Sequence, residues 1–139
     1  MRTKILIIFT LMIIGSCGKK EQKEGLAQLE NLVVRISEIE VFPMYLDEYV
    51  AILKEEAEAS VRLEPGVISI YPMFVEENTS QIRILEIYSD EKAYNDHLQT
   101  PHFKHYKSAT LKMVKSLKLI DMESMDKETM PEIFKKLER

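Results

Sequence analysis

The chain has 139 residues, of which 45% are hydrophobic and 30% charged, with four glycines and one cysteine. This composition is typical of one folded domain and excludes a low-complexity or collagen-like chain. The net charge of −4 gives no basic footprint, so no nucleic-acid partner is expected.

The N-terminus has the pattern of an export signal. Arg2 and Lys4 precede an apolar run over residues 5–14, which is too short to span a bilayer as a helix. The segment Ile14-Gly15-Ser16-Cys17 resembles a bacterial lipobox, in which the cysteine becomes the lipidated first residue. We therefore expect a signal peptide over residues 1–16 and a lipid on Cys17. The alternative is an ordinary secretory signal with an incidental cysteine.

Residues 17–30 are polar and charged, which predicts a tether, with a short helix as the alternative. Together with the lipidated cysteine, the tether predicts a membrane-anchored bacterial lipoprotein that faces the periplasm or lies elsewhere in the cell envelope.

The next segment predicts a strand followed by an amphipathic helix. Residues 31–41 are rich in β-branched side chains set among polar ones, as in a half-exposed strand. Pro43 suits the first turn of a helix, and Glu64-Pro65-Gly66 ends it. The apolar stripe of this helix comprises Leu46, Tyr49, Val50, Leu53, Ala57 and Val61. The glutamates of the helix, Glu56 among them, are expected away from this stripe.

Residues 67–75 and 81–88 predict two antiparallel strands joined by a polar connection over residues 76–80. Ser89 is expected to cap a short helix that reaches Leu98. Thr100, followed by Pro101, is expected to cap another helix. The inward residues of that helix are predicted to be Phe103, Tyr106, Thr110 and Met113.

A fourth strand is predicted over residues 116–122, and a helical tail over residues 124–139. The resulting order β-α-β-β-α-β predicts an α+β, ferredoxin-like domain over residues 31–123, with its helices on one face of the sheet. The other sheet face would leave a large apolar patch in water, so a homodimer is expected to cover it.

The segment LEIYSDEKAYNDHLQTPHFKHY, residues 85–106, carries a family resemblance. It is similar to the antibiotic biosynthesis monooxygenase superfamily, in its quinol monooxygenase branch, over roughly residues 31–122 of the chain. The residues that match the family pattern are Glu86, Tyr88, His97, Leu98, Thr100, Pro101, His102 and Phe103. The resemblance implies a dimeric α+β barrel, in which two sheets pack face to face and each subunit keeps a pocket between its sheet and helices.

The chemistry implied by the resemblance is cofactor-free oxidation of a quinol or similar hydroxylated aromatic by O2. A base would remove the hydroxyl proton, and the electron-rich phenolate would then pass an electron to O2. Histidine suits the base, and the family motif makes His97 and His102 the catalytic candidates. The alternative that both histidines are structural stays open.

Residues on the central strands and the last helix are expected to contact the substrate. They are Arg35, Tyr71, Glu86, Tyr88, Phe103 and Tyr106. Glu86 would either orient a histidine or, by preference, form a structural ion pair with Arg35.

No cofactor and no bound metal are expected. His102-x-x-His105 has the spacing of metal ligands on a helix but lacks a clear third ligand. Relatives that degrade haem use a Trp and a ligating His, but this chain has no Trp, and His97 and Lys107 stand at those two positions. Relatives that isomerise a phosphorylated sugar derivative act on a cytosolic substrate that an exported protein rarely meets. The alternative to an enzyme is a lipid-anchored module that binds a small apolar or aromatic ligand.

Overall fold

The computed structural model describes residues 31–126, 129, 132–133 and 136. The predicted signal peptide, Cys17 and the tether lie outside the described residues, as does most of the predicted tail. The described tail residues 129, 132, 133 and 136 are helical. Among the described helices, none is long and apolar enough to cross a membrane.

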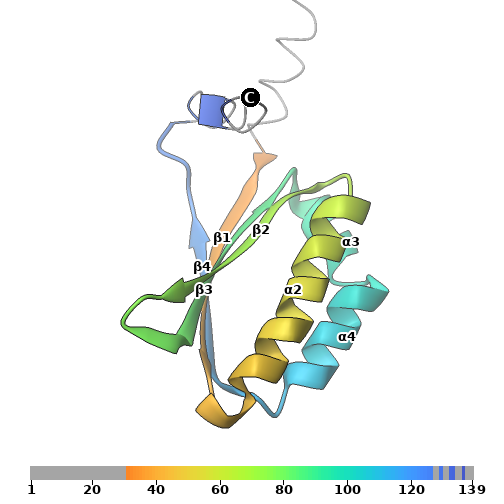
Figure 1. Cartoon of the computed structure of the whole chain (residues 1–139). Helices are drawn as coiled ribbons and strands as arrows, with labels where there is room; N and C mark the ends of the chain where they lie inside the picture. The colour runs from red at the N-terminus through yellow and green to blue at the C-terminus, as the bar shows by residue number, and fades with distance from the viewer. Residues whose placement is uncertain (1–30, 127–128, 130–131, 134–135, 137–139) are drawn as a thin grey trace, which may run out of the picture.

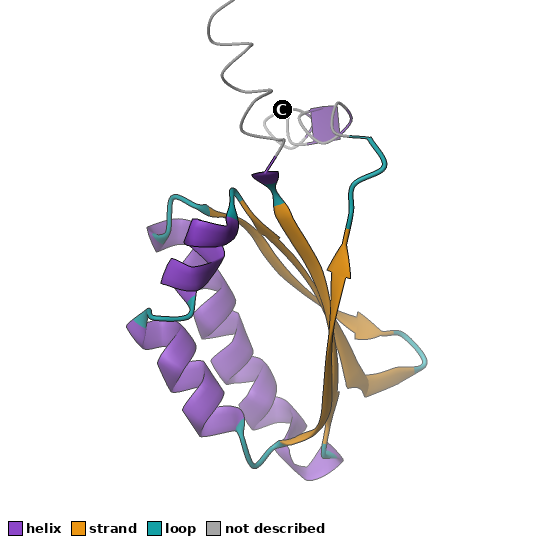
Figure 2. Cartoon of the chain, turned by 180° about the vertical axis from the view of Figure 1, so that it is seen from behind, coloured by secondary structure: helices purple, strands orange, loops and turns teal. Residues whose placement is uncertain are grey.

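The chain forms one four-stranded antiparallel sheet with helices on a single face (Figures 1 and 2). The elements are β1 (Val33–Val41), the 3-10 helix η2 (Pro43–Tyr45), α2 (Leu46–Leu63), β2 (Val67–Val75), β3 (Asn78–Tyr88), α3 (Glu91–His97), α4 (Pro101–Thr110) and β4 (Val114–Met122). The strand order is β2-β3-β1-β4, so β1 and β3 are central. The predicted ferredoxin-like α+β fold is confirmed.

Two element boundaries differ from the prediction: the start of β3 and the N-cap of α3. β3 begins at Asn78, because the turn after β2 contains only Glu76 and Glu77. The N-cap of α3 is Asp90 and not Ser89: the Asp90 carboxylate accepts a hydrogen bond from the backbone N of Ala93 at 2.7 Å. A carboxylate there also favours the positive end of the helix dipole.

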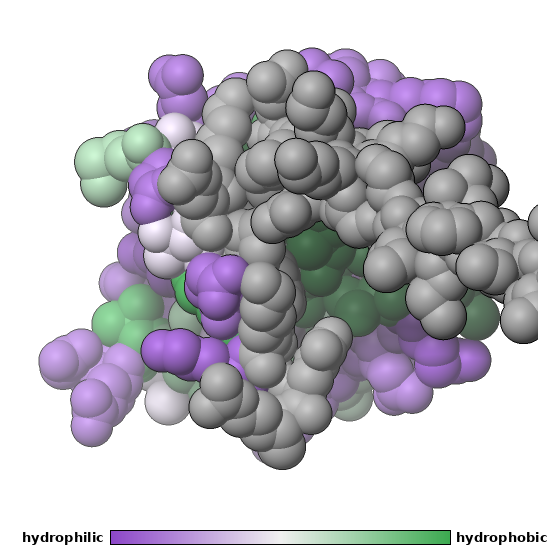
Figure 3. Space-filling view, turned by 90° about the horizontal axis from the view of Figure 1, so that it is seen from above, coloured by the Kyte–Doolittle hydropathy of each residue, from purple (hydrophilic) through white to green (hydrophobic). Residues whose placement is uncertain are grey.

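The core lies between the sheet and α2. Fully buried residues include Val41 of β1, Ile82 of β3, Tyr49 of α2 and Met113. Seen from above in Figure 3, some hydrophobic side chains are visible near the middle of the domain, and much of its margin is hydrophilic. Burial of this apolar surface is the main favourable term that holds α2 and α4 over the sheet.

The two residues Pro65 and Gly66, which follow α2, have different physical roles. Pro65 disfavours a helical residue before it, and Glu64 accordingly has extended backbone angles, φ −105° and ψ 106°. Gly66 does not have positive φ; instead, a Cβ at this position would overlap the side chain of Ala93 in α3. The missing side chain of Gly66 therefore lets α3 pack closely against the segment that follows α2.

Candidate active site

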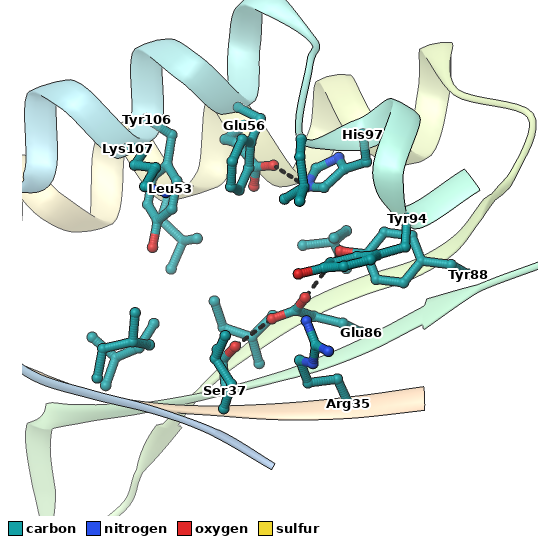
Figure 4. Close-up of a pocket in the computed structure, with 17 residues that line it drawn as sticks. Arg35, Ser37, Leu53, Glu56, Glu86, Tyr88, Tyr94, His97, Tyr106 and Lys107 are labelled. Carbon is teal, nitrogen blue, oxygen red and sulfur yellow. Dashed lines mark hydrogen bonds and ion pairs between the residues drawn. The ribbon is translucent and has the colours of Figure 1, made fainter. Parts of the chain in front are cut away.

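A cavity of about 220 Å³ lies between the sheet and the helices (Figure 4). Its apolar lining includes Leu53, Ile70, Ile84, Phe103, Leu117 and Leu119. A dry apolar cavity of about 150 Å³ is enough to hold benzene, so this cavity suits an aromatic molecule of one or two rings. Leu117 and Leu119 on the edge strand β4 are 58% and 51% exposed, so the cavity is open toward that edge.

The sheet side of the cavity carries a carboxylate held by two donors. Glu86 on β3 accepts a hydrogen bond from Ser37 Oγ of β1 and another from the Tyr88 hydroxyl at 2.9 Å. Hydrogen bonds to the charged form stabilise a carboxylate in a partly buried position. In Figure 4, Glu86 projects from the sheet toward the cavity.

The helix side of the cavity carries a second carboxylate, next to a histidine. Glu56 of α2 is only 5% exposed, and its Oε1 accepts a hydrogen bond from Ser60 Oγ at 2.9 Å. The same Oε1 lies 3.6 Å from His97 Nε2 (Figure 4). Burial raises the pKa of the Glu56 carboxyl group.

His97 is the last residue of α3 and is 2% exposed. Its ring is packed between Phe103 and Tyr88, with ring centroids 4.7 and 5.4 Å away. Its Nδ1 lies 3.0 Å from Glu64 Oε1, and His102 Nε2 lies 2.6 Å from the same oxygen. Because a carboxylate only accepts, both histidines donate an N–H to Glu64. In the neutral ring, His97 Nε2 is then the acceptor nitrogen, and it faces Glu56 Oε1 at 3.6 Å in the cavity wall.

The buried tyrosines around the cavity are donors and not bases. Tyr88 and Tyr49 have their pKa values raised by burial, and burial likewise raises the pKa of Tyr106 to about 12. The Tyr49 and Tyr106 hydroxyls are hydrogen-bonded to each other at 2.6 Å. These phenols stay neutral at ordinary pH, which leaves histidine and carboxylate groups as proton acceptors.

Six of the eight predicted catalytic and substrate-binding residues line the cavity: Arg35, Glu86, Tyr88, His97, Phe103 and Tyr106. Tyr71 does not, because Ile70 of β2 faces the cavity and adjacent strand residues point to opposite faces; Tyr71 is 60% exposed. His102 does not line it either and reaches His97 only through Glu64.

The expected ion pair between Glu86 and Arg35 is replaced by another. Arg35 lies opposite Glu86 on β3 and opposite Asp121 on β4. Its guanidinium Nη2 pairs with Asp121 Oδ1 at 2.6 Å, and its Cζ lies 4.5 Å from the centroid of the Tyr94 ring. Glu86 instead accepts hydrogen bonds from Ser37 and Tyr88.

Two functional candidates were missed at the sequence level. Glu56 was placed outside the buried stripe, which is wrong; it follows Tyr49 by seven residues and Leu53 by three, which is stripe spacing. Glu64 was interpreted only as part of the helix stop. Together with His97 and His102 it also forms a group of three potential metal ligands, whereas His105 is exposed and outside this group.

Comparisons with known proteins decide the family. The profile of the antibiotic biosynthesis monooxygenases matches residues 32–109, more than half of the chain. The chain belongs to the antibiotic biosynthesis monooxygenase family. A crystal structure of a proposed antibiotic biosynthesis monooxygenase from Bacteroides thetaiotaomicron is 51% identical, with a TM-score of 0.70 over 70% of this chain and 93% of that chain.

Other solved structures of monooxygenase-named proteins are more distant. One from Lactobacillus acidophilus is 29% identical, with a TM-score of 0.66, over 67% of this chain and 44% of that chain. A proposed antibiotic biosynthesis monooxygenase from Nitrosomonas europaea shares the fold at 17% identity and a TM-score of 0.65, over 68% and 91% of the two chains. No curated protein matches the chain.

The match to the antibiotic biosynthesis monooxygenase family covers the helical side of the cavity completely. It includes Glu56, Glu64, His97 and His102, and it ends within α4. The open wall formed by Leu117 and Leu119 of β4 lies beyond the match. The glutamates and histidines of the site thus lie within the residues that match the family, while the open wall of the cavity lies on β4, beyond the match.

Proposed function

We propose that this protein is a cofactor-independent monooxygenase that acts with O2 on a quinol or a similar hydroxylated aromatic of one or two rings. Family membership supports the reaction class, and the cavity of about 220 Å³ supports the size of the substrate. The observation that carries the proposal is the orientation of His97, whose Nδ1 is held by Glu64 and whose Nε2 lies in the cavity wall beside Glu56.

In this proposal His97 is the general base. Glu64 fixes the tautomer of the ring, so that Nε2 can take the proton of a substrate hydroxyl. The carboxylate also stabilises the imidazolium that forms. His102 is a positioning residue, because it contacts Glu64 and not the cavity.

The sheet side would hold a second polar group of the substrate. Glu86 keeps acceptor capacity beyond the bonds from Ser37 and Tyr88, since each carboxylate oxygen accepts more than one hydrogen bond. A dihydroxy aromatic would place one hydroxyl toward His97 and another toward Glu86. The apolar walls between them would reduce the contact of the phenolate with water, which raises its tendency to give an electron to O2.

The reaction balances without an external reductant. A quinol and O2 yield a hydroxyquinone and water: one oxygen atom forms the new bond to carbon, and the other leaves as water. All four electrons that reduce O2 come from the aromatic substrate. The proton taken by His97 is returned to the departing oxygen.

A matched pair of ligands tests this proposal. A naphthohydroquinone has the hydroxyl protons that the base needs, whereas its dimethyl ether has the same rings but none. With ¹⁸O2, we expect one labelled oxygen atom in the quinone product and no turnover of the ether. Product without label would contradict monooxygenation, and saturable binding of both ligands without turnover would favour the non-enzymatic binding module.

We also propose that the protein is a lipoprotein of the cell envelope, supported by the lipobox-like sequence that ends at Cys17. Cys17→Ala is expected to move the protein from the membrane fraction to the soluble fraction of cells, because the lipid would be its anchor. Cell fractionation measures this. A variant that stays in the membrane fraction would contradict lipid anchorage.

A homodimer is proposed through the sheet face opposite the helices. Tyr71 and Met122 lie on strands of this sheet and are 60% and 48% exposed, and they alternate with residues of the helix-covered face. Covering such a patch favours association. A solution mass of twice the chain mass is expected, and a monomer at micromolar concentration would contradict it.

A further inference from the structure

Glu64, His97 and His102 meet where three helix ends converge, behind the part of the cavity wall that His97 forms. Glu64 follows the last residue of α2, His97 ends α3, and His102 is the second residue of α4. Their ligand atoms, one from each residue, all lie within 4.8 Å of one another. The side chains of Glu64 and His102 are 13% and 18% exposed, so an ion can reach them from solvent.

The donor set of this group is that of a transition-metal site. Two imidazoles and one carboxylate bind Zn²⁺ and other divalent ions of the first transition row. In the structure, the two imidazole N–H groups point at one Glu64 oxygen, at 3.0 and 2.6 Å. A metal ion would replace these two protons. Zinc bonds to nitrogen are about 2.0–2.1 Å long, and an ion placed between the three ligand atoms could reach all of them after small side-chain adjustments, since these atoms lie within 4.8 Å of one another.

A buried carboxylate behind the histidine supports the same site independently. A metal-bound histidine usually donates its other ring N–H to a carboxylate, which fixes the ring and strengthens the ligand. Glu56 Oε1 lies 3.6 Å from His97 Nε2 and is itself held by Ser60. Within the described residues, the ion pairs of Glu56 and Glu64 are with histidines alone, so their charge is not matched by a lysine or an arginine.

We propose that Glu64, His97 and His102 form a binding site for a divalent transition-metal ion of the zinc class, and that its occupation inhibits turnover. The metal would take the Nδ1 lone pair of His97. The single proton of the neutral ring would then lie on Nε2, where Glu56 accepts it. With its acceptor lost, His97 can no longer take the proton of a substrate hydroxyl. The inhibitory half rests on the proposed function, and the binding half does not.

Zinc titration of the chelator-treated full-length chain in detergent tests the binding half. One zinc ion per chain is expected by elemental analysis, with saturable binding measured in competition with a chromophoric chelator. His102→Gln and Glu64→Ala are expected to weaken binding more than about 100-fold, since even loss of an outer partner costs 10–100-fold. His105→Ala is the matched control, because His105 is an exposed histidine of the same helix outside the group.

Thermal unfolding keeps the test independent of activity. An ion that binds only the folded state raises its melting temperature, so zinc should raise Tm in the natural chain and in His105→Ala but not in His102→Gln. Equal zinc affinity in His102→Gln and the natural chain would overturn the site. Absence of saturable binding in the micromolar range would overturn it as well.

Oxygen uptake tests the inhibition of turnover separately from the binding of zinc. Inhibition over the same zinc range as binding, reversed by chelator, supports the full proposal. Undiminished turnover at full zinc occupancy overturns the inhibitory half. If the metal-free protein does not turn over any hydroxylated aromatic, the proposed function and the inhibitory half fall together, whereas the zinc site stands or falls on titration alone.

Discussion

Replacing His97 with alanine is expected to lower kcat for a hydroxylated aromatic by roughly 10²–10⁴-fold, the usual contribution of a general base. The loss would follow from its place in the cavity: it lines the wall, and with Nδ1 held by Glu64 the proposed base is Nε2. The measurement is steady-state oxygen uptake, corrected for autoxidation.

His97→Gln separates catalysis from folding. The histidine is 2% exposed and packed against Phe103 and Tyr88, so alanine also leaves a cavity that destabilises the fold. Glutamine keeps most of the volume and can donate to Glu64, but its amide is not a base. We expect this variant to fold and to bind the aromatic, with kcat as low as in His97→Ala. A folded His97→Gln protein with natural turnover would exclude His97 as the base.

Glu64→Ala is expected to lower kcat roughly 10–100-fold with little change in KM. Glu64 does not line the cavity; in the proposed mechanism it acts by holding the His97 ring in the tautomer with the proton on Nδ1. In a Ser-His-Asp triad, loss of the corresponding carboxylate lowers kcat through the wrong tautomer, so the effect of Glu64→Ala is expected in kcat. The fold should also lose about 1–3 kcal/mol for each buried donor left without an acceptor, which thermal unfolding measures.

Glu64→Gln is the matched variant. Its side-chain oxygen still accepts hydrogen bonds from both histidines, while the negative charge is gone. We expect kcat and stability between those of the natural chain and Glu64→Ala. A raised KM at unchanged kcat in either variant would place Glu64 in substrate binding and contradict the positioning role.

The sequence predicts the fold well because local patterns and global packing agree. Alternating strands, the Pro65 helix stop and the Thr100 cap each specify their element, and the structure has them at nearly the expected residues. The errors are small and local. Asp90 is a stronger cap than its neighbour Ser89, because its carboxylate reaches the Ala93 amide and also favours the helix dipole.

The site is less predictable because its contacts join distant residues. Glu64 lies 33 and 38 positions from the two histidines that it binds, and no local pattern reports such a contact. The burial of Glu56 could have been predicted, because this residue stands at the spacing of the buried stripe. The charge of its side chain argued against burial. The ion-pair partner of Arg35 was also hard to predict, because an acidic residue lies opposite it on each of the two neighbouring strands. The structure pairs Arg35 with Asp121 of the edge strand β4.

The most direct test is oxygen uptake by the metal-free chain with a naphthohydroquinone, without added cofactor, in the natural protein and in His97→Gln. We predict uptake that exceeds autoxidation in the natural protein and falls to the autoxidation rate in the variant, although both bind the aromatic. Equal uptake by the two proteins, or no uptake above autoxidation by either, would contradict a cofactor-free monooxygenase that uses His97 as its base.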